Sequence, residues 1–152
     1  MDVKTILDNK GRDVETVGPD TSVEDVAKLL TEKKIGSVLV MDGDEILGIV
    51  NERSLVKAIC IHGADAIRQP VSEIMRTNVM VCSSDSSVDS VRTQMTKMNM
   101  RHLPVVDGGK LTGIVSIGDV LKFRIRELKH GGESRFQHWF ESKGVRPLRS
   151  DR

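Results

Sequence analysis

The sequence repeats itself with an offset of 65 residues, and this repeat constrains the fold more than any other feature of the chain. Residues 12–61 align without a gap on residues 77–126, with 13 identities at 50 positions. Two unrelated segments of that length would share about three residues at ordinary amino-acid frequencies. The longest shared run is Gly-Ile-Val, at 48–50 and again at 113–115. Two copies favour a pseudo-symmetric pair over an array of stacked repeats.

Each copy shows the same order of predicted elements. In the first copy, a short β-prone run at 14–17 precedes apolar residues spaced three and four apart, which is typical of an amphipathic helix. Thr21, and Ser86 in the second copy, fit the cap of that helix, because an acidic residue follows three positions later. β-prone runs at 37–41 and 46–50 flank an Asp-Gly pair and predict a hairpin, which a second helix follows. The predicted fold class is therefore mixed α+β, with two pseudo-symmetric β-α-β-β-α repeats.

The repeat divides the chain into four parts. The first repeat with its N-terminal lead-in takes 1–66, a connection takes 67–77, the second repeat takes 78–129, and a tail takes 130–152. The connection has neither the length nor the composition of a flexible linker. We therefore expect the two repeats to pack tightly against each other.

The tail differs from the repeats in composition. It holds three of the four aromatic residues of the chain, Phe136, Trp139 and Phe140. Their spacing of three and four places them on one face of a short helix. This face is expected either to cover the molecule's own surface or a dimer contact, or to dock a partner protein.

Composition narrows the classes of function. A formal net charge of +1 disfavours a nucleic-acid binder, which needs a dense basic surface. No apolar run approaches the roughly 20 residues of a membrane span, and no signal peptide begins the chain, so we expect a cytoplasmic protein without a membrane partner. The two cysteines, Cys60 and Cys82, are too few for a disulfide scaffold, and Cys82 is expected to be buried and inert. No catalytic triad, paired carboxylates, phosphate loop or zinc-ligand pattern appears, so neither an enzyme nor a metal site is expected.

The segment 113–119, Gly-Ile-Val-Ser-Ile-Gly-Asp, carries the clearest candidate chemistry. Ser116 ends a predicted strand, and Asp119 lies in the first turn of the helix that follows. Exposed N–H groups at a helix N-terminus can bind phosphate, and a carboxylate can accept two hydrogen bonds from a ribose diol. The alternative interpretation is that Ser116 only caps the helix and that Asp119 is a favourable first-turn carboxylate.

Two β-α-β-β-α units with P-D-x-S/T-V near the start, V-x-D-G in the middle and G-I-V-S-x-x-D at the close resemble the CBS domain, named after cystathionine β-synthase. Two copies resemble a Bateman module, and the resemblance covers about residues 12–126. It implies a regulatory, energy-sensing protein that is not an enzyme and binds an adenosine-containing ligand such as AMP, ADP, ATP, NAD, NADH or S-adenosylmethionine. It further implies a homodimer formed through the helices, and a partner protein that the module regulates. The alternative is a protein-interaction scaffold that works without a ligand.

The resemblance also implies where the main ligand site lies. In the family, the Ser or Thr of the closing motif contacts phosphate and the Asp holds ribose, while the other repeat encloses the adenine. Gly36 fits such a site for a physical reason of its own, since a flat ring can approach the backbone closely where there is no side chain. The alternative is that Gly36 only ends the preceding helix. The implied main site comprises Thr16, Val17, Ile35, Gly36, Ser37, Val38, Val115, Ser116 and Asp119.

The first copy departs from the family pattern at its closing motif. Asn51 replaces the Ser or Thr, and Ser54 replaces the Asp that would hold ribose. This second site is therefore expected to be weaker, empty or selective for another ligand. Arg101 and His102 resemble the basic pair that meets phosphates in the family, or else are ordinary exposed residues before a strand. The implied second site comprises Asn51, Arg53, Ser54, Cys82, Met100, Arg101, His102 and Leu103.

Overall fold

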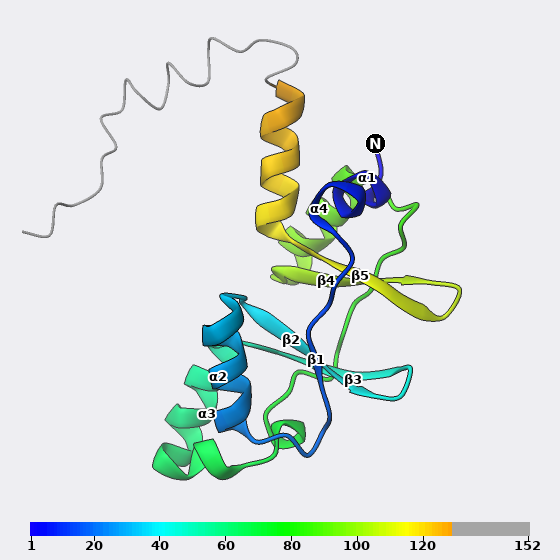
Figure 1. Ribbon diagram of the computed structural model, residues 1–152. Coiled ribbons are helices and arrows are strands. Elements are labelled where there is room, and N and C mark those ends of the chain that lie inside the picture. The colour runs from blue at the N-terminus through cyan, green and yellow to red at the C-terminus, as the bar shows by residue number, and fades with distance from the viewer. Residues whose placement is uncertain (129–152) are drawn as a thin grey trace, which may run out of the picture.

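The computed structural model describes residues 1–128, which form two lobes that follow the sequence repeat (Figure 1). The first repeat contains β1 (Thr16–Val17), α2 (Val23–Lys33), β2 (Ser37–Asp42), β3 (Glu45–Asn51) and α3 (Glu52–His62). The second repeat contains α4 (Val88–Met98), β4 (His102–Asp107), β5 (Lys110–Ser116) and a helix over 117–128. The lead-in contains α1 (Val3–Lys10), the 3-10 helix η1 (Gly63–Arg68) runs from the end of the first repeat into the connection, and the connection contains a second 3-10 helix, η2 (Val71–Glu73). The predicted fold class is confirmed, and the predicted tail helix with Phe136, Trp139 and Phe140 lies outside the described residues.

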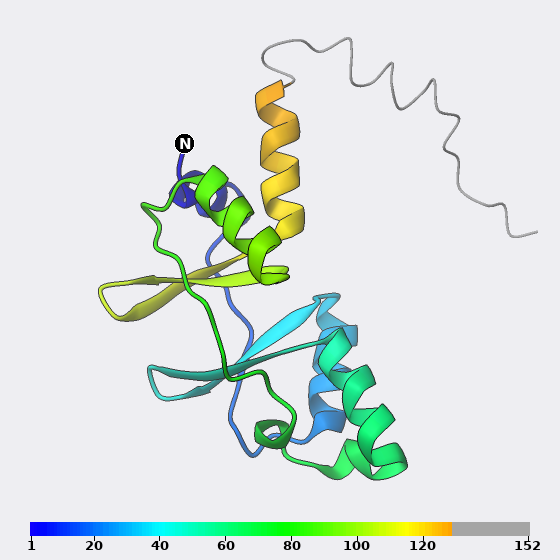
Figure 2. The ribbon, with the colours of Figure 1, turned by 180° about the vertical axis from the view of Figure 1, so that it is seen from behind.

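The two repeats match element by element. The helices α2 and α4, and the hairpins β2–β3 and β4–β5, begin and end 65 residues apart. Each hairpin has a register shift at the same place, between Val40 and Met41 in the first repeat and at the equivalent position in the second. Each helix ends at a left-handed residue, Lys34 (φ 53°) or Asn99 (φ 51°). From either side, the hairpin turns point the same way, one above the other (Figures 1 and 2).

The predicted helix caps, Thr21 and Ser86, are wrong by one residue. The hydroxyl of Ser22 accepts from the backbone N–H of Asp25 at 3.1 Å, and Ser87 caps α4 in the same way. The carbonyl of Thr21 accepts a backbone hydrogen bond from Val71 instead, at 2.7 Å. The N–H of Thr21 closes a turn onto the carbonyl of Gly18 at 3.2 Å, and Ser22 pairs with Pro70 of the connection, so the helix begins one residue later than predicted.

The first strand differs between the repeats. In the first repeat, β1 pairs in parallel with β2, and β2 pairs antiparallel with β3. In the second, the run at 79–82 that corresponds to the β-prone run at 14–17 forms only a single parallel bridge, between Cys82 and Val105. The physical reason is Pro104, which stands where the first repeat has Leu39. The N–H of Leu39 donates to the carbonyl of Glu15 at 3.2 Å, and a proline has no N–H to make that bond.

Each repeat's core is completed by the segment that precedes the other repeat. From α1, Val3, Ile6 and Leu7 are buried in the core of the second repeat. From the connection, Val71 is buried in the core of the first repeat, and Ile74 and Met75 pack against it. In Figure 1, α1 accordingly lies beside α4, in the lobe of the second repeat. The two repeats thus exchange segments, α1 and the connection, and these exchanged segments join the repeats on both sides of the molecule.

The exchange explains the glycine of the shared Gly-Ile-Val motif. A Cβ at Gly113 would lie 2.7 Å from Cδ2 of Leu7, and a Cβ at Gly48 would lie 2.7 Å from Sδ of Met75. Both distances are too short for real contacts, so a Cβ at either glycine would force the segment packed on it to shift. Within the described residues, no helix combines the length and the apolar character that crossing a membrane requires.

Candidate functional site

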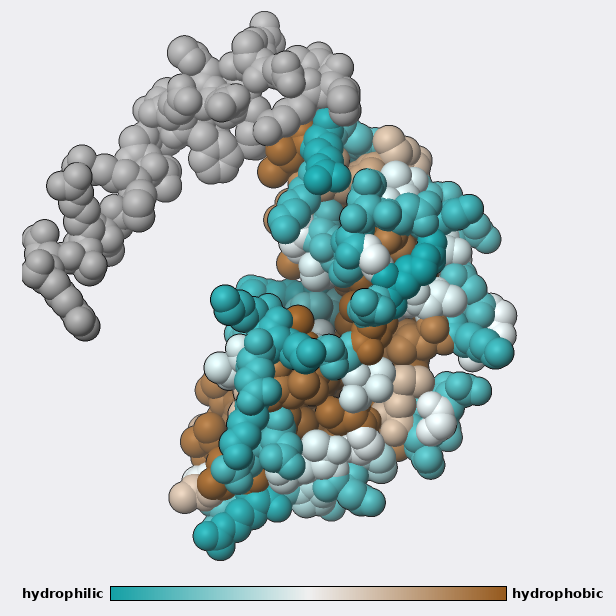
Figure 3. Space-filling view, in the orientation of Figure 1, coloured by the Kyte–Doolittle hydropathy of each residue, from teal (hydrophilic) through white to brown (hydrophobic). Residues whose placement is uncertain are grey.

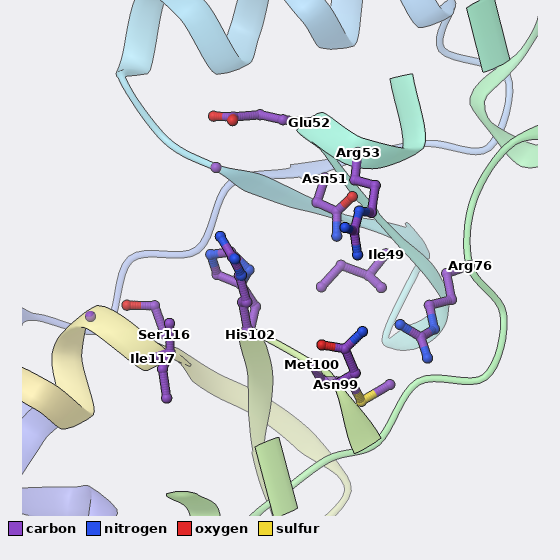
Figure 4. A pocket seen from close by; sticks show the side chains of 13 residues that line it. Ile49, Asn51, Glu52, Arg53, Arg76, Asn99, Met100, His102, Ser116 and Ile117 are labelled. Atoms are coloured by element: carbon purple, nitrogen blue, oxygen red, sulfur yellow. The ribbon is translucent and has the colours of Figure 1, made fainter. Parts of the chain in front are cut away.

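A cavity of about 620 Å³ lies between the two repeats (Figure 4). That volume is within the range of pockets that bind nucleotide-sized ligands. Its walls come from the strand ends and helix starts of both repeats, so a ligand inside it would touch both. The residues that line it are Gly36, Ile49, Asn51, Glu52, Arg53, Arg76, Asn99, Met100, Arg101, His102, Ser116, Ile117 and Gly118.

The cavity brings together members of both predicted sites. Gly36 and Ser116 come from the predicted main site. From the predicted second site come Asn51, Arg53, Met100, Arg101 and His102. The lining of this cavity therefore includes residues from both predicted sites.

The remaining predicted residues do not line this cavity. Several are buried in the strands, because β2 and β4 are covered on both faces and consecutive residues of each are buried. Val38, Leu103 and Val115 are fully buried, and Ser37 and Cys82 nearly so. The residues outside the lining are Thr16, Val17, Ile35, Ser37, Val38, Ser54, Cys82, Leu103, Val115 and Asp119.

Sequence reasoning missed six lining residues: Ile49, Glu52, Arg76, Asn99, Ile117 and Gly118. Three of them could have been found, because Glu52, Ile117 and Gly118 are sequence neighbours of predicted residues. They lie in the first turn of a helix, whose N-terminus opens toward the cavity. Arg76 had no such signal. It reaches the cavity because its backbone pairs with Ile49 of β3, through hydrogen bonds of 2.9 and 3.0 Å.

Both closing motifs form reciprocal caps at the start of a helix. The Oγ of Ser116 accepts from the N–H of Asp119 at 3.1 Å, and Oδ2 of Asp119 accepts from the N–H of Ser116 at 2.9 Å. The Oδ1 of Asn51 accepts from the N–H of Ser54 at 2.9 Å, and Oγ of Ser54 accepts in return at 3.3 Å. The capping interpretation of Ser116 and Asp119 is thus confirmed, and the same cap holds Ser116 at the cavity wall.

Asp119 also forms an ion pair with Lys10 of α1. The Nζ of Lys10 lies 2.7 Å from Oδ2 of Asp119 and donates to the carbonyl of Ile114 at 2.8 Å. Burial would raise the pKa of Asp119, but the hydrogen bonds from Lys10 and from the N–H of Ser116, with the charge of Lys10, outweigh it. The pKa of Asp119 therefore lies below its ordinary value, and the carboxylate is charged at neutral pH.

His102 lies beside Gly36. A Cβ at Gly36 would lie 3.5 Å from Cε1 of His102, so the imidazole stands next to the bare backbone where the resemblance implies an adenine. Burial and the charges of Lys10 and Arg101 lower the pKa of His102, and Asp119 only partly opposes them. His102 is therefore neutral at pH 7 and offers a planar ring to a ligand.

The lining of the cavity is mainly basic. Arg53, Arg76 and Arg101 face it, against the single carboxylate of Glu52. In Figure 4, Ser116 and Glu52 are on one side of His102, and Arg53 and Arg76 are on the other. Such a lining suits an anionic ligand. In the part of the chain that the structure describes, no three His, Cys, Asp or Glu residues gather to hold a metal ion.

The thiol of Cys82 takes no part in this cavity. Its side chain is buried, as predicted, and lies near the carbonyl of Pro104. Burial and the nearby carboxylate of Asp107 raise its pKa to about 11, so the reactive thiolate is scarce at neutral pH.

A family model described as CBS domain matches residues 3–61 and 71–126, and the chain belongs to this family. Solved structures agree with this assignment. A CBS-domain-containing protein from Agrobacterium tumefaciens is 48% identical, with a TM-score of 0.80 over 82% of this chain and 99% of that one. A putative signal-transduction protein with CBS domains from Burkholderia ambifaria is 42% identical, with a TM-score of 0.79 over 83% of this chain and 95% of that one.

One structural relative was solved with adenosine-containing ligands. The CBS domain pair of protein MJ0100, in complex with 5′-methylthioadenosine and S-adenosyl-L-methionine, is 28% identical, with a TM-score of 0.72 over 81% of this chain and 98% of that chain. Among curated relatives, the CBS domain-containing protein YhcV of Bacillus subtilis is 27% identical over 118 residues, which are 78% of this chain and 84% of that protein. Other curated relatives are longer, and the chain spans only 16% of an A-adding tRNA nucleotidyltransferase from Geobacter sulfurreducens.

Proposed function

We propose that the chain is a regulatory module that binds an adenosine-containing nucleotide, AMP, ADP, ATP, NAD or NADH, in the cavity between its repeats. The observation that carries this proposal is the shared cavity itself, whose walls come from both repeats. A ligand that contacts both repeats favours the arrangement in which it fits best. The resulting change in arrangement is the signal to a partner protein, and the module acts by binding rather than by catalysis.

The chemistry of the cavity matches the parts of such a ligand. The arginines and the N-termini of α3 and the helix over 117–128 suit phosphates, and Asp119 beside the cavity suits a ribose diol. Gly36 and the ring of His102 suit the flat base. The complexes of MJ0100 with 5′-methylthioadenosine and S-adenosyl-L-methionine support a ligand with an adenosine part.

Isothermal titration calorimetry with AMP, ATP, NAD and NADH tests the proposal directly. Mass spectrometry of whatever small molecule stays bound through gentle purification would identify the ligand. A ligand present at 100 times its Kd should add about 2.7 kcal/mol to the free energy of unfolding, which a melting experiment detects easily. If none of the four compounds binds or raises the melting temperature, the proposal is wrong.

We also propose a homodimer formed through α3 and the helix over 117–128. Val56 and Ile59 on α3, and Leu121 on the later helix, are more than half exposed. Figure 3 shows apolar surface along the lower lobe where Figure 1 has α3. Light scattering should give twice the chain mass, and Val56→Glu with Leu121→Glu should halve it. The double substitution Glu32→Gln with Lys97→Gln, on exposed positions of α2 and α4, serves as a control.

A ligand-independent scaffold is the second candidate, and one observation favours it. The polar groups of both closing motifs are satisfied inside the chain, by the reciprocal caps and by Lys10. The melting experiment separates the two candidates, because a scaffold gains no stability from any of the nucleotides.

A further inference from the structure

Lys10 reaches Asp119 from outside the repeated part of the sequence. It is the last residue of α1, and it lies 109 positions before Asp119 in the sequence. Its Nζ lies 2.7 Å from Oδ2 and 2.8 Å from the carbonyl oxygen of Ile114. The side chains of Lys10 and Asp119 are 31% and 18% exposed, so the pair is partly shielded from water.

The oxygen that Lys10 contacts is already in use. Oδ2 of Asp119 accepts the backbone N–H of Ser116 at 2.9 Å as part of the helix cap. A carboxylate oxygen has two lone pairs, and here Ser116 and Lys10 take both. The backbone donor is fixed by the helix start, whereas the lysine side chain is free to move away.

The first repeat cannot form this pair. Counting back 65 residues, Ser54 stands in the place of Asp119 and carries no charge. Met75 of the connection covers Gly48 as Leu7 of α1 covers Gly113, so these two apolar side chains dock the exchanged segments. Val3, Ile6 and Leu7 anchor α1 in the core of the second repeat, and Lys10 adds a charged contact to the one closing motif that has a carboxylate.

We propose that Lys10 is an internal competitor for the ribose position of Asp119, and that a ribose diol must displace it from Oδ2 to bind through both carboxylate oxygens. This inference rests on the proposed function. A vicinal diol presents two donors, and when each hydroxyl donates to a different carboxylate oxygen, one of them needs the lone pair on Oδ2 that Lys10 holds. Binding at Asp119 and docking of the end of α1 thus oppose each other, and each weakens the other by the same factor.

The test measures the affinity of adenosine for the native protein and for Lys10→Met, which removes the ammonium group and keeps an unbranched side chain. Adenosine carries a diol and no phosphate, so the lost positive charge cannot act through a phosphate. Because a partly exposed ion pair is worth up to about 1 kcal/mol, Lys10→Met should bind adenosine about two- to fivefold more tightly. Lys4→Met makes the same charge change at an exposed position of α1 and should leave the affinity unchanged.

Two further measurements separate competition from a general effect on the fold. The gain in Lys10→Met should disappear for 3′-deoxyadenosine, which lacks the diol, and in the Asp119→Asn background. Lys10→Gln keeps a donor for the carbonyl of Ile114 and should show the same gain, and it replaces Lys10→Met if that variant does not fold.

Equal or weaker binding of adenosine by Lys10→Met and Lys10→Gln, with the native protein binding adenosine normally, overturns the role of Lys10 and leaves the proposed function intact. A gain that persists for 3′-deoxyadenosine overturns it as well. If no form of the protein binds any adenosine compound, the proposed function fails first, and this inference falls with it.

Discussion

The closing motifs of the two repeats, 48–54 and 113–119, have the same backbone task and differ in charge. Each ends a hairpin, begins a helix and forms a reciprocal cap with a residue three positions later. Asn51 and Ser54 form the reciprocal cap without a carboxylate. The cap in the second repeat therefore does not require the carboxylate of Asp119, and the ion pair with Lys10 shows that this carboxylate also binds a cationic group.

The largest expected effect concerns the glycines that open these motifs. Gly48→Ala should lower the free energy of unfolding by about 3 kcal/mol and Gly113→Ala by about 1 kcal/mol, because both overpack a core. The added Cβ at 48 would meet the backbone carbonyl of Arg76 at 2.9 Å, whereas at 113 it would meet only the flexible Leu7. Urea denaturation measures both, with Gly18→Ala as a control, since a Cβ there meets nothing within 4 Å. Equal losses would show that the two exchanged segments pack alike.

The second prediction compares the two positions that follow the caps. Asp119→Ala should weaken AMP binding about 10- to 100-fold, since a hydrogen bond to a charged group contributes about 1.5–3 kcal/mol. Ser54→Ala should change the affinity less than twofold, because the first repeat has no carboxylate for ribose. Titration calorimetry on both variants provides the comparison. Equal losses in the two variants would remove the distinction between a main and a second site.

The sequence predicted the fold more completely than it predicted the contacts around the candidate site. The 65-residue offset predicted the order of elements in both repeats, because it carries over the apolar periodicity and the turn residues. It could not choose between Thr21 and Ser22 as a helix cap, since either hydroxyl suits the position and the choice depends on pairing with the connection. It could not find Lys10, because that contact joins a segment outside the repeat to its far end.

Ten of the seventeen predicted site residues do not line this cavity, and their part in binding stays a prediction. Among them, Val38 in β2 and Val115 in β5 are fully buried, and the sequence motif alone does not distinguish a buried strand residue from a cavity residue. Arg76 reaches the cavity only because the connection pairs with β3, which is a tertiary contact with no local signal.

The third prediction concerns pH and the pair of equivalent residues Ser37 and His102. The pKa of His102 is lowered in the folded chain, so below about pH 6.5 the unfolded chain binds more protons, and stability falls as the pH drops through the folded pKa. His102→Gln removes this contribution. Its melting temperature should therefore fall less than that of the native protein between pH 7.5 and 5.5.

His62→Gln is the matched control, because His62 is an exposed histidine at the end of α3. It should behave like the native protein. An identical pH dependence in the native protein and His102→Gln would mean that the half-buried ring of His102 contributes no pH sensitivity.

The smallest expected effect tests why the first strand of the second repeat is a single bridge. Pro104→Ala restores an N–H where Leu39 of the first repeat donates to Glu15, and the equivalent acceptor is the carbonyl of Met80. The new hydrogen bond contributes about 0.5–1.5 kcal/mol, but losing the proline costs about 0.4–1 kcal/mol through the freer unfolded chain. The free energy of unfolding should therefore change by less than about 1 kcal/mol.

The hydrogen-exchange rate at position 104 is the sharper measurement, because it reports the bond itself rather than the net balance. A backbone amide that pairs with Met80 should be protected like that of Leu39, its equivalent in β2. A fast-exchanging amide there would mean that something other than the missing donor shortens the strand. In that case the difference between the two sheets would come from the path of the connection and not from one proline.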